Sequence, residues 1–246
     1  MNIELGDSIS RNISFNGLKT CCLLLNGGVY VSTPNLTGVA SNSLYRLGWL
    51  RLEDSPALQT LSFPNLTEGI YLNLLLMALP LLTEFEFGAS LTLPVYTFIG
   101  GTGLKSFSAS LPANTLNPQY DYGSEGFYIT QNKDMSQIHL GFKAYIAAGF
   151  SGFAGFAISD NAPGAIIDLP YLRSLNLDTH FGDFSSLNIP RLQVVNSSLN
   201  ISNAQVSRFS APSLQNAGGN FSLTGNFSEY VLVSELRTIT ADGRSL

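Results

Sequence analysis

Two carboxylates of the chain stand at a spacing that could serve acid–base chemistry. Glu84 and Glu86 are two residues apart in a segment with strand-like alternation, so both face one side of the strand, about 7 Å from each other. Carboxylate pairs at about this separation carry out glycoside hydrolysis. Such a pair also needs one acid whose pKa is raised inside a cleft, and nothing around these residues indicates burial. We therefore favour an exposed strand face over a catalytic pair.

Asp178, His180 and Asp183 could be drawn as a metal-binding cluster. Two ligands at i and i+2 with a third beyond a glycine arise easily by accident, and no supporting outer shell is discernible, so we expect no metal here. The chain has only two histidines, His139 and His180, which leaves little material for a Ser-His-Asp triad. No G-x-S-x-G, Walker or dinucleotide-binding glycine pattern occurs. The sequence thus predicts a protein that is not an enzyme and uses no cofactor.

Aromatic residues in the middle of the chain are candidates for binding. Tyr120, Tyr122 and Tyr128 offer apolar rings with hydroxyls that can stay in water, so a binding role and a packing role are equally open for them. The phenylalanines at 150, 153 and 156 lie in a glycine-rich run, and we expect them to continue the core.

A leucine frame recurs along the chain: leucine, two residues, an apolar residue, one residue, and another apolar residue, often followed by Pro-x-Leu. Clear copies begin at Leu58, Leu82 and Leu104, and later ones at Leu172, Phe184 and Val206. Their spacing is mostly 22 to 24 residues, a period typical of leucine-rich repeats and β-solenoids. The 12 residues between Leu172 and Phe184 leave two interpretations open, a short coil or two strands of one coil.

Strand side chains alternate, so each copy of the frame predicts one inward and one outward set. The inward pairs are Leu61 with Phe63, Phe85 with Phe87, Phe107 with Ala109, Leu175 with Leu177, and Leu187 with Ile189. The outward pairs are Thr60 with Ser62, Glu84 with Glu86, Ser106 with Ser108, Ser174 with Asn176, Ser186 with Asn188, and Arg208 with Ser210. This outward ladder, Asn176 and Asn188 included, is a candidate surface for sugars or for another protein, with a solvated sheet face as the alternative. A proline directly after a strand lacks a donor and is expected to end the ladder.

The frame resembles a known kind of repeat. Phe63–Thr67, Ile189–Leu192 and Ala211–Leu214 are each followed by small residues and then by an apolar pair two residues apart. This resembles the receptor L-domain-like repeats of fungal cell-wall glycoproteins and, more loosely, the BspA-type leucine-rich repeats of bacterial surface proteins, over roughly residues 31–112 and 160–228. The resemblance implies a non-enzymatic wall, adhesion or recognition protein. The chain departs from the fungal pattern in showing no leader, no anchor signal and no flanking cysteines.

Composition narrows the class of partner. Of 246 residues only 12% are charged, and the formal charge is −5, so no cationic footprint for nucleic acid or for an anionic membrane exists. The two cysteines, Cys21 and Cys22, are adjacent and are expected to pack rather than to bond to each other. No secretory signal is visible, and the most apolar stretch, 70–82, is too short to span a membrane and contains Asn73 and Pro80.

Together these observations predict a mostly β, leucine-rich-repeat-like β-solenoid that forms a single elongated domain. We expect an N-terminal cap at 1–30, repeats at 31–112, an irregular aromatic and glycine-rich insertion at 113–163, repeats at 164–228 and a C-terminal cap at 229–246. The expected function is a non-catalytic scaffold for recognition, adhesion or assembly, whose partner is a protein, a glycan or another copy of the chain. Its expected place is extracellular, on a cell surface, or in a virion or phage tail. A carbohydrate-active β-solenoid enzyme is the competing class.

Overall fold

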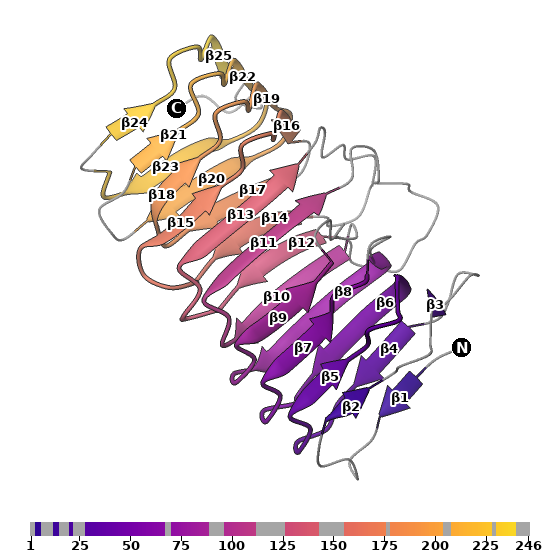
Figure 1. The fold of residues 1–246 in the computed structure, drawn as a ribbon. Coiled ribbons are helices and arrows are strands. Elements are labelled where there is room, and N and C mark those ends of the chain that lie inside the picture. The colour runs from indigo at the N-terminus through magenta and orange to yellow at the C-terminus, as the bar shows by residue number, and fades with distance from the viewer. Residues whose placement is uncertain are drawn as a thin grey trace. The chain divides into compact units, whose positions relative to one another are not determined.

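A computed structural model describes residues 3–5, 12–14, 20–21, 28–66, 70–88, 96–111, 126–142, 155–175, 178–203, 208–227 and 230–239. These residues form strands and turns, with no helix among them (Figure 1), and the recorded strand pairs are parallel. Parallel neighbours about 20 to 31 residues apart are the arrangement of a β-solenoid, which confirms the predicted fold class. Within the described ranges no helix is long and apolar enough to cross a membrane.

The chain divides into two compact units, 1–105 with 129–134, and 106–128 with 135–246. In unit 1, each coil contributes one strand to a first sheet and one to a second sheet. The first sheet consists of β1 (Ile3–Leu5), β4 (Gly28–Val31), β6 (Arg46–Glu53), β8 (Ile70–Leu79) and β10 (Tyr96–Thr102), with β3 (Thr20–Cys21) beside β6. The second consists of β2 (Ile13–Ser14), β5 (Gly38–Ala40), β7 (Thr60–Phe63) and β9 (Glu84–Phe87).

Unit 2 has a third strand in its later coils. Its first sheet contains β14 (Gly155–Ser159), β17 (Asp178–Gly182), β20 (Leu199–Asn203) and β23 (Phe221–Gly225), with β12 (Gly126–Thr130) beside β14. Its second sheet is β11 (Ser106–Leu111), β13 (Gln137–Phe142), β15 (Ala165–Asp168), β18 (Phe184–Asn188), β21 (Arg208–Ser210) and β24 (Tyr230–Leu232). The third is β16 (Ser174–Leu175), β19 (Val194–Val195), β22 (Asn216–Ala217) and β25 (Thr238–Ile239).

The alternation predicted from the leucine frame is present in the core. Leu61 and Phe63 on β7 are fully buried, whereas Thr60 and Ser62 between them are half-buried on the other face. The other described inward positions are buried as well, namely Phe107, Ala109, Leu175, Leu187 and Ile189. Phe85 and Phe87 of β9 are only half-buried, and their rings stack with centroids 4.3 Å apart. Leu177 lies outside the described residues.

The Pro-x-Leu motif forms the turn that ends a strand. Leu66 N donates to Phe63 O across Pro64 (3.0 Å), and Leu192 N donates to Ile189 O across Pro190 (3.2 Å). Proline suits the second position of such a turn because its φ is already fixed there. The leucine then returns to the core, since Leu66 and Leu192 are fully buried. Proline and leucine thus act together, one closing the corner and the other anchoring it.

The opposite corner follows the strands of the first sheets and uses a left-handed residue. Asp54, Gln131, Asp160 and Asp183 come directly after β6, β12, β14 and β17, with φ between 47° and 61°. Aspartate tolerates this conformation better than most residues. A buried polar residue comes next at three of these corners, and Asn132 shows its role. Its amide accepts from Thr102 N and Thr102 Oγ1 and donates to Ile99 O and Thr130 O, at 2.7 to 3.1 Å.

Two expectations need correction, and one open choice is decided. The described parts of 113–163 form β12, β13 and β14, which take places in the sheets, so they continue the coil instead of leaving it. The frame is lost there because the coils are longer: Phe107 pairs with Ile138 and Ile138 with Ile167, 31 and 29 residues further on. Second, Ser174 is not outward: it is 6% exposed, and its hydroxyl has no partner among the described residues.

The short spacing between Leu172 and Phe184 leaves two interpretations open in the sequence. Leu172 precedes β16 and Phe184 begins β18, which lie in different sheets. The spacing therefore separates two strands of one coil, and the short-coil interpretation is excluded.

The expected cap segments contain short strands. Ile13–Ser14 forms β2, which pairs with β5, and Thr238–Ile239 forms β25, which pairs with β22. Cys21 lies on β3, and the side chains of Cys21 and Cys22 are outside the described residues. Phe156 is buried, as predicted, whereas residues 150 and 153 are not described.

Replacing Leu175 with aspartate tests the buried frame. Leu175 is fully buried on β16, and an unpaired carboxylate there cannot be solvated, so we expect Leu175→Asp to lose the cooperative thermal transition of the wild type. Gln193→Asp adds the same charge at an exposed position before β19 and should melt like the wild type. A Leu175→Asp protein that melts at the wild-type temperature would show that the assignment of inward positions is wrong.

Ala78 tests the cost of left-handed backbone. It is exposed within β8 at φ 54°, where a residue with a Cβ pays about 1–2 kcal/mol. Ala78→Gly removes that cost but destabilises the fold by about 0.5–1 kcal/mol, because glycine loses more conformational entropy on folding. Ala78→Val adds a clash of its β-branched side chain. We expect denaturation midpoints in the order glycine, alanine, valine, with glycine at or slightly above alanine. A valine variant as stable as the wild type would contradict the observed backbone.

Candidate binding groove

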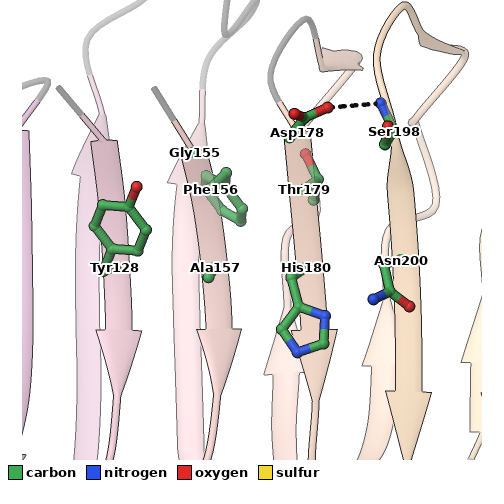
Figure 2. Close-up of a pocket in the computed structure, with 9 residues that line it drawn as sticks. All are labelled: Tyr128, Gly155, Phe156, Ala157, Asp178, Thr179, His180, Ser198 and Asn200. Carbon is green, nitrogen blue, oxygen red and sulfur yellow. Dashed lines mark hydrogen bonds between the residues drawn. The ribbon is translucent and has the colours of Figure 1, made fainter. Parts of the chain in front are cut away.

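A shallow groove of about 390 Å³ lies on the outward face of the first sheet of unit 2 (Figure 2). It crosses β12, β14, β17 and β20. Its outward side chains are those of Tyr128, Ala157, Asp178, His180, Ser198 and Asn200, with Gly155 at the floor. The volume falls within the range of about 300–1,000 Å³ found for small-molecule sites.

Strand register produces the groove. Gly155 pairs with Asp178, Ala157 with His180, and His180 with Asn200, so the outward residues of neighbouring strands stand in rows. The intervening residues Phe156 and Thr179 are 1% and 3% exposed and hold the strands to the core. Because β14 presents only glycine and alanine outward, a hollow opens between the larger side chains of β12 and β17.

Tyr128 lies along the sheet surface, as its ring, seen nearly face-on in Figure 2, indicates. A Cβ on Gly126 would come within 2.3 Å of its ring, and one on Gly155 within 2.8 Å of its hydroxyl oxygen. The ring therefore occupies space that only these two glycines leave free. Its inner face rests on backbone, and its outer face forms one side of the groove.

Asp178 is fixed as a hydrogen-bond acceptor at the rim. Its Oδ1 accepts from the Ser197 hydroxyl at 2.5 Å and from the Ser198 N–H at 3.2 Å, the second bond being drawn in Figure 2. These two bonds, the Ser197 hydroxyl first, lower the pKa of Asp178 below its ordinary value, while partial desolvation opposes them. Asp178 is thus ionised at neutral pH, and the Ser198 hydroxyl also donates to its carboxylate.

His180 leaves a polar atom unsatisfied in the groove. Its Nδ1 is buried and has no hydrogen-bond partner among the residues the structure describes. Buried polar atoms are usually paired, and an exception in a concave site calls for an explanation such as a ligand. Asn200 stands beside it on β20 with an exposed amide that can both donate and accept.

The residues predicted to bind are only partly brought together. Tyr128 lines the groove, whereas Glu84 and Glu86 are exposed on β9 in unit 1, where Glu86 accepts from the Ser62 hydroxyl. Asn188 lies on the second sheet of unit 2, donating to Asp168 Oδ1 at 2.8 Å. Tyr120, Tyr122 and Asn176 lie outside the described residues.

The combination of Asp178, His180 and Asp183 does not form a metal cluster. Asp178 and His180 share the outward face of β17, but Asp183 belongs to the left-handed corner after it. Within the described ranges, no three His, Cys, Asp or Glu side chains converge as metal ligands. The sequence singled out two of the groove residues, although for a different chemistry.

Register also creates a Ser-His-Asp row that sequence reasoning missed. On the second sheet of unit 2, Ser108 pairs with His139 and His139 with Asp168, and His139 Nδ1 lies 2.9 Å from Asp168 Oδ2. A nucleophile also needs a hydrogen bond to its base, and the structure has none between Ser108 and His139. Ser108 and His139 are moreover exposed on a sheet face away from the groove. The row is therefore an incomplete triad.

A scan of family models, a search of curated proteins and a search of solved structures found no significant match to this chain.

The hydrogen bonds of Asp178 predict a pH-dependent contribution to stability. Because the pKa of Asp178 is lower in the folded state than in the unfolded state, its carboxylate stabilises the fold above about pH 4, and this stabilisation is lost as the pH falls through the folded-state pKa. Asp178→Asn keeps an acceptor oxygen but not the charge. We expect it to be less stable than the wild type in urea at pH 7, and the gap to close as the pH falls through the folded-state pKa of Asp178.

Glu84→Gln is the matched control, since it removes one exposed carboxylate of unit 1. A gap for Asp178→Asn that stays constant from pH 7 to the acid limit would contradict the assigned hydrogen bonds.

Proposed function

We propose that the protein is a non-catalytic recognition scaffold, and that the groove over β12, β14, β17 and β20 is its binding site. The groove itself supports this most directly, because it combines an aromatic face, a small-residue floor and hydrogen-bonding groups on a rigid sheet. Sites built on strands hold their side chains more precisely than sites on loops. Such a surface suits a ligand that is held and not transformed.

The chemistry of the described carboxylates favours binding over catalysis. Asp178 is the single carboxylate among the described residues that line the groove, and its lowered pKa makes it an acceptor rather than a general acid at neutral pH. Glycoside hydrolysis in its usual form needs a second carboxyl group across the site. Glu84 and Glu86 stand on one exposed strand in unit 1 and share no groove.

The proposal keeps the two placements expected from the sequence, a cell surface or a large particle such as a virion. A low charge content suits both, because few ions need to be stripped of water when neutral faces meet. Labelled antibody on intact cells and on purified particles decides between them.

The Ser108–His139–Asp168 row provides a direct test of the non-catalytic proposal. With p-nitrophenyl acetate, which a Ser-His-Asp triad hydrolyses, we expect the wild type and Ser108→Ala to release p-nitrophenol at equal rates. The reason is that Ser108 makes no hydrogen bond to His139 and is not activated. Ser186→Ala, which changes a half-buried serine of the same sheet, is the control. A loss of turnover of tenfold or more in both Ser108→Ala and His139→Ala would overturn the proposal.

A further inference from the structure

We infer that the groove binds one pyranose ring of a neutral glycan, stacked on Tyr128 and hydrogen-bonded to Asp178, His180 and Asn200. This inference rests on the proposed binding role of the groove and names the class of ligand.

The aromatic face has the shape that a sugar ring requires. A pyranose presents a flat patch of C–H groups, which packs against an open aromatic ring through dispersion and the removal of apolar surface from water. Gly126 and Gly155 hold the Tyr128 ring flat against the sheet, so its outer face is presented to the groove. Adjacent strands are about 4.8 Å apart, so the polar groups of β17 lie about 10 Å from the line of β12, roughly the width of one sugar ring with its hydroxyls.

The polar groups match hydroxyls, which both donate and accept. The Asp178 carboxylate accepts hydrogen bonds, and the Asn200 amide offers a donor and an acceptor. His180 lines the groove, and its Nδ1 is buried with no partner among the described residues. Vicinal hydroxyls suit this set of groups because they both donate and accept, whereas an apolar ligand makes no hydrogen bond to them.

The charge of the groove selects a neutral glycan. Among the described residues, the groove lining contains the ionised Asp178 and no lysine or arginine, and the whole chain carries −5. Uronate or sulfate groups would meet a carboxylate with no cation to compensate it. With one ring and a shallow site, we expect a Kd of about 0.1–1 mM for a neutral oligosaccharide.

Titration of the full chain with glucose-, galactose- and mannose-based neutral oligosaccharides, followed by ligand-observed NMR, tests the inference. The protein should be made in bacteria, because Asn200 begins an N-I-S sequon and a glycan attached there would fill the groove. At least one neutral oligosaccharide should bind with the expected Kd, and a uronate oligomer of equal length should bind at least tenfold more weakly.

Variants separate stacking from hydrogen bonding. Tyr128→Ala should weaken binding at least tenfold, Tyr128→Phe by less than about threefold, and Asn200→Ala by about three- to tenfold. Gly155→Val fills the hollow and, because its Cβ would lie 2.8 Å from the Tyr128 hydroxyl oxygen, also displaces that ring, so it should abolish binding. Tyr171→Ala, an exposed tyrosine outside the groove, is the matched control and should bind like the wild type. Melting curves for each variant confirm that the fold is retained.

The outcomes distinguish the ligand class from the function. If peptides bind the wild type but not Tyr128→Ala, and no glycan binds, the sugar inference is overturned and the recognition role is retained. If a glycan binds and is cleaved during the titration, the inferred ligand class is retained and the non-catalytic role is overturned. No binding of any neutral oligosaccharide at 10 mM, or equal binding by Tyr128→Ala and the wild type, overturns the inference.

Discussion

The stacking of coils on one another is the constraint on which the structure depends. Each coil exposes an apolar edge that it cannot cover alone, and burying it needs the inward residues of neighbouring coils in register, as Leu61 over Phe85 and Leu187 over Phe209 illustrate. Once the inward residues are in register, the outward ones are as well, because strand side chains alternate. The rows on the outer faces are thus a consequence of the core.

Those rows determine what each face can do. Where β17 and β20 carry Asp178, His180 and Asn200 next to the small residues of β14, the face is hollow and polar. Where Thr60 and Ser62 face Glu84 and Glu86, the face is exposed and acidic, and the Ser62–Glu86 hydrogen bond satisfies the groups within the sheet. The same scaffold therefore carries both a concave surface and a flat one, and the difference lies in the size of single outward residues.

Much of the core was predictable because its signal is local. Leu61 and Phe63 follow a period of two within β7, and Leu187 is an inward residue of β18. The Pro-x-Leu turn after β7 is encoded in four consecutive residues. Tyr128 was recognisable as a binding candidate by residue type alone.

The rest depends on register between strands 20 to 31 residues apart, which no local pattern contains. That is why the Ser108–His139–Asp168 row and the groove were not predicted, and why Asp178 and His180 were considered for a metal. Ser174 was misplaced because β16 belongs to a third side of the coil, where the alternation of the frame does not apply.

Amide chemical shifts during titration with a neutral oligosaccharide test the central claim most directly, because they report where on the scaffold a ligand sits. If the ligand binds in the groove, we expect saturable chemical-shift changes at the amides of β12, β14, β17 and β20, centred on 155–157 and 178–180. Shifts centred instead on the second sheet, at Ser108 and His139, or on β9 would contradict it.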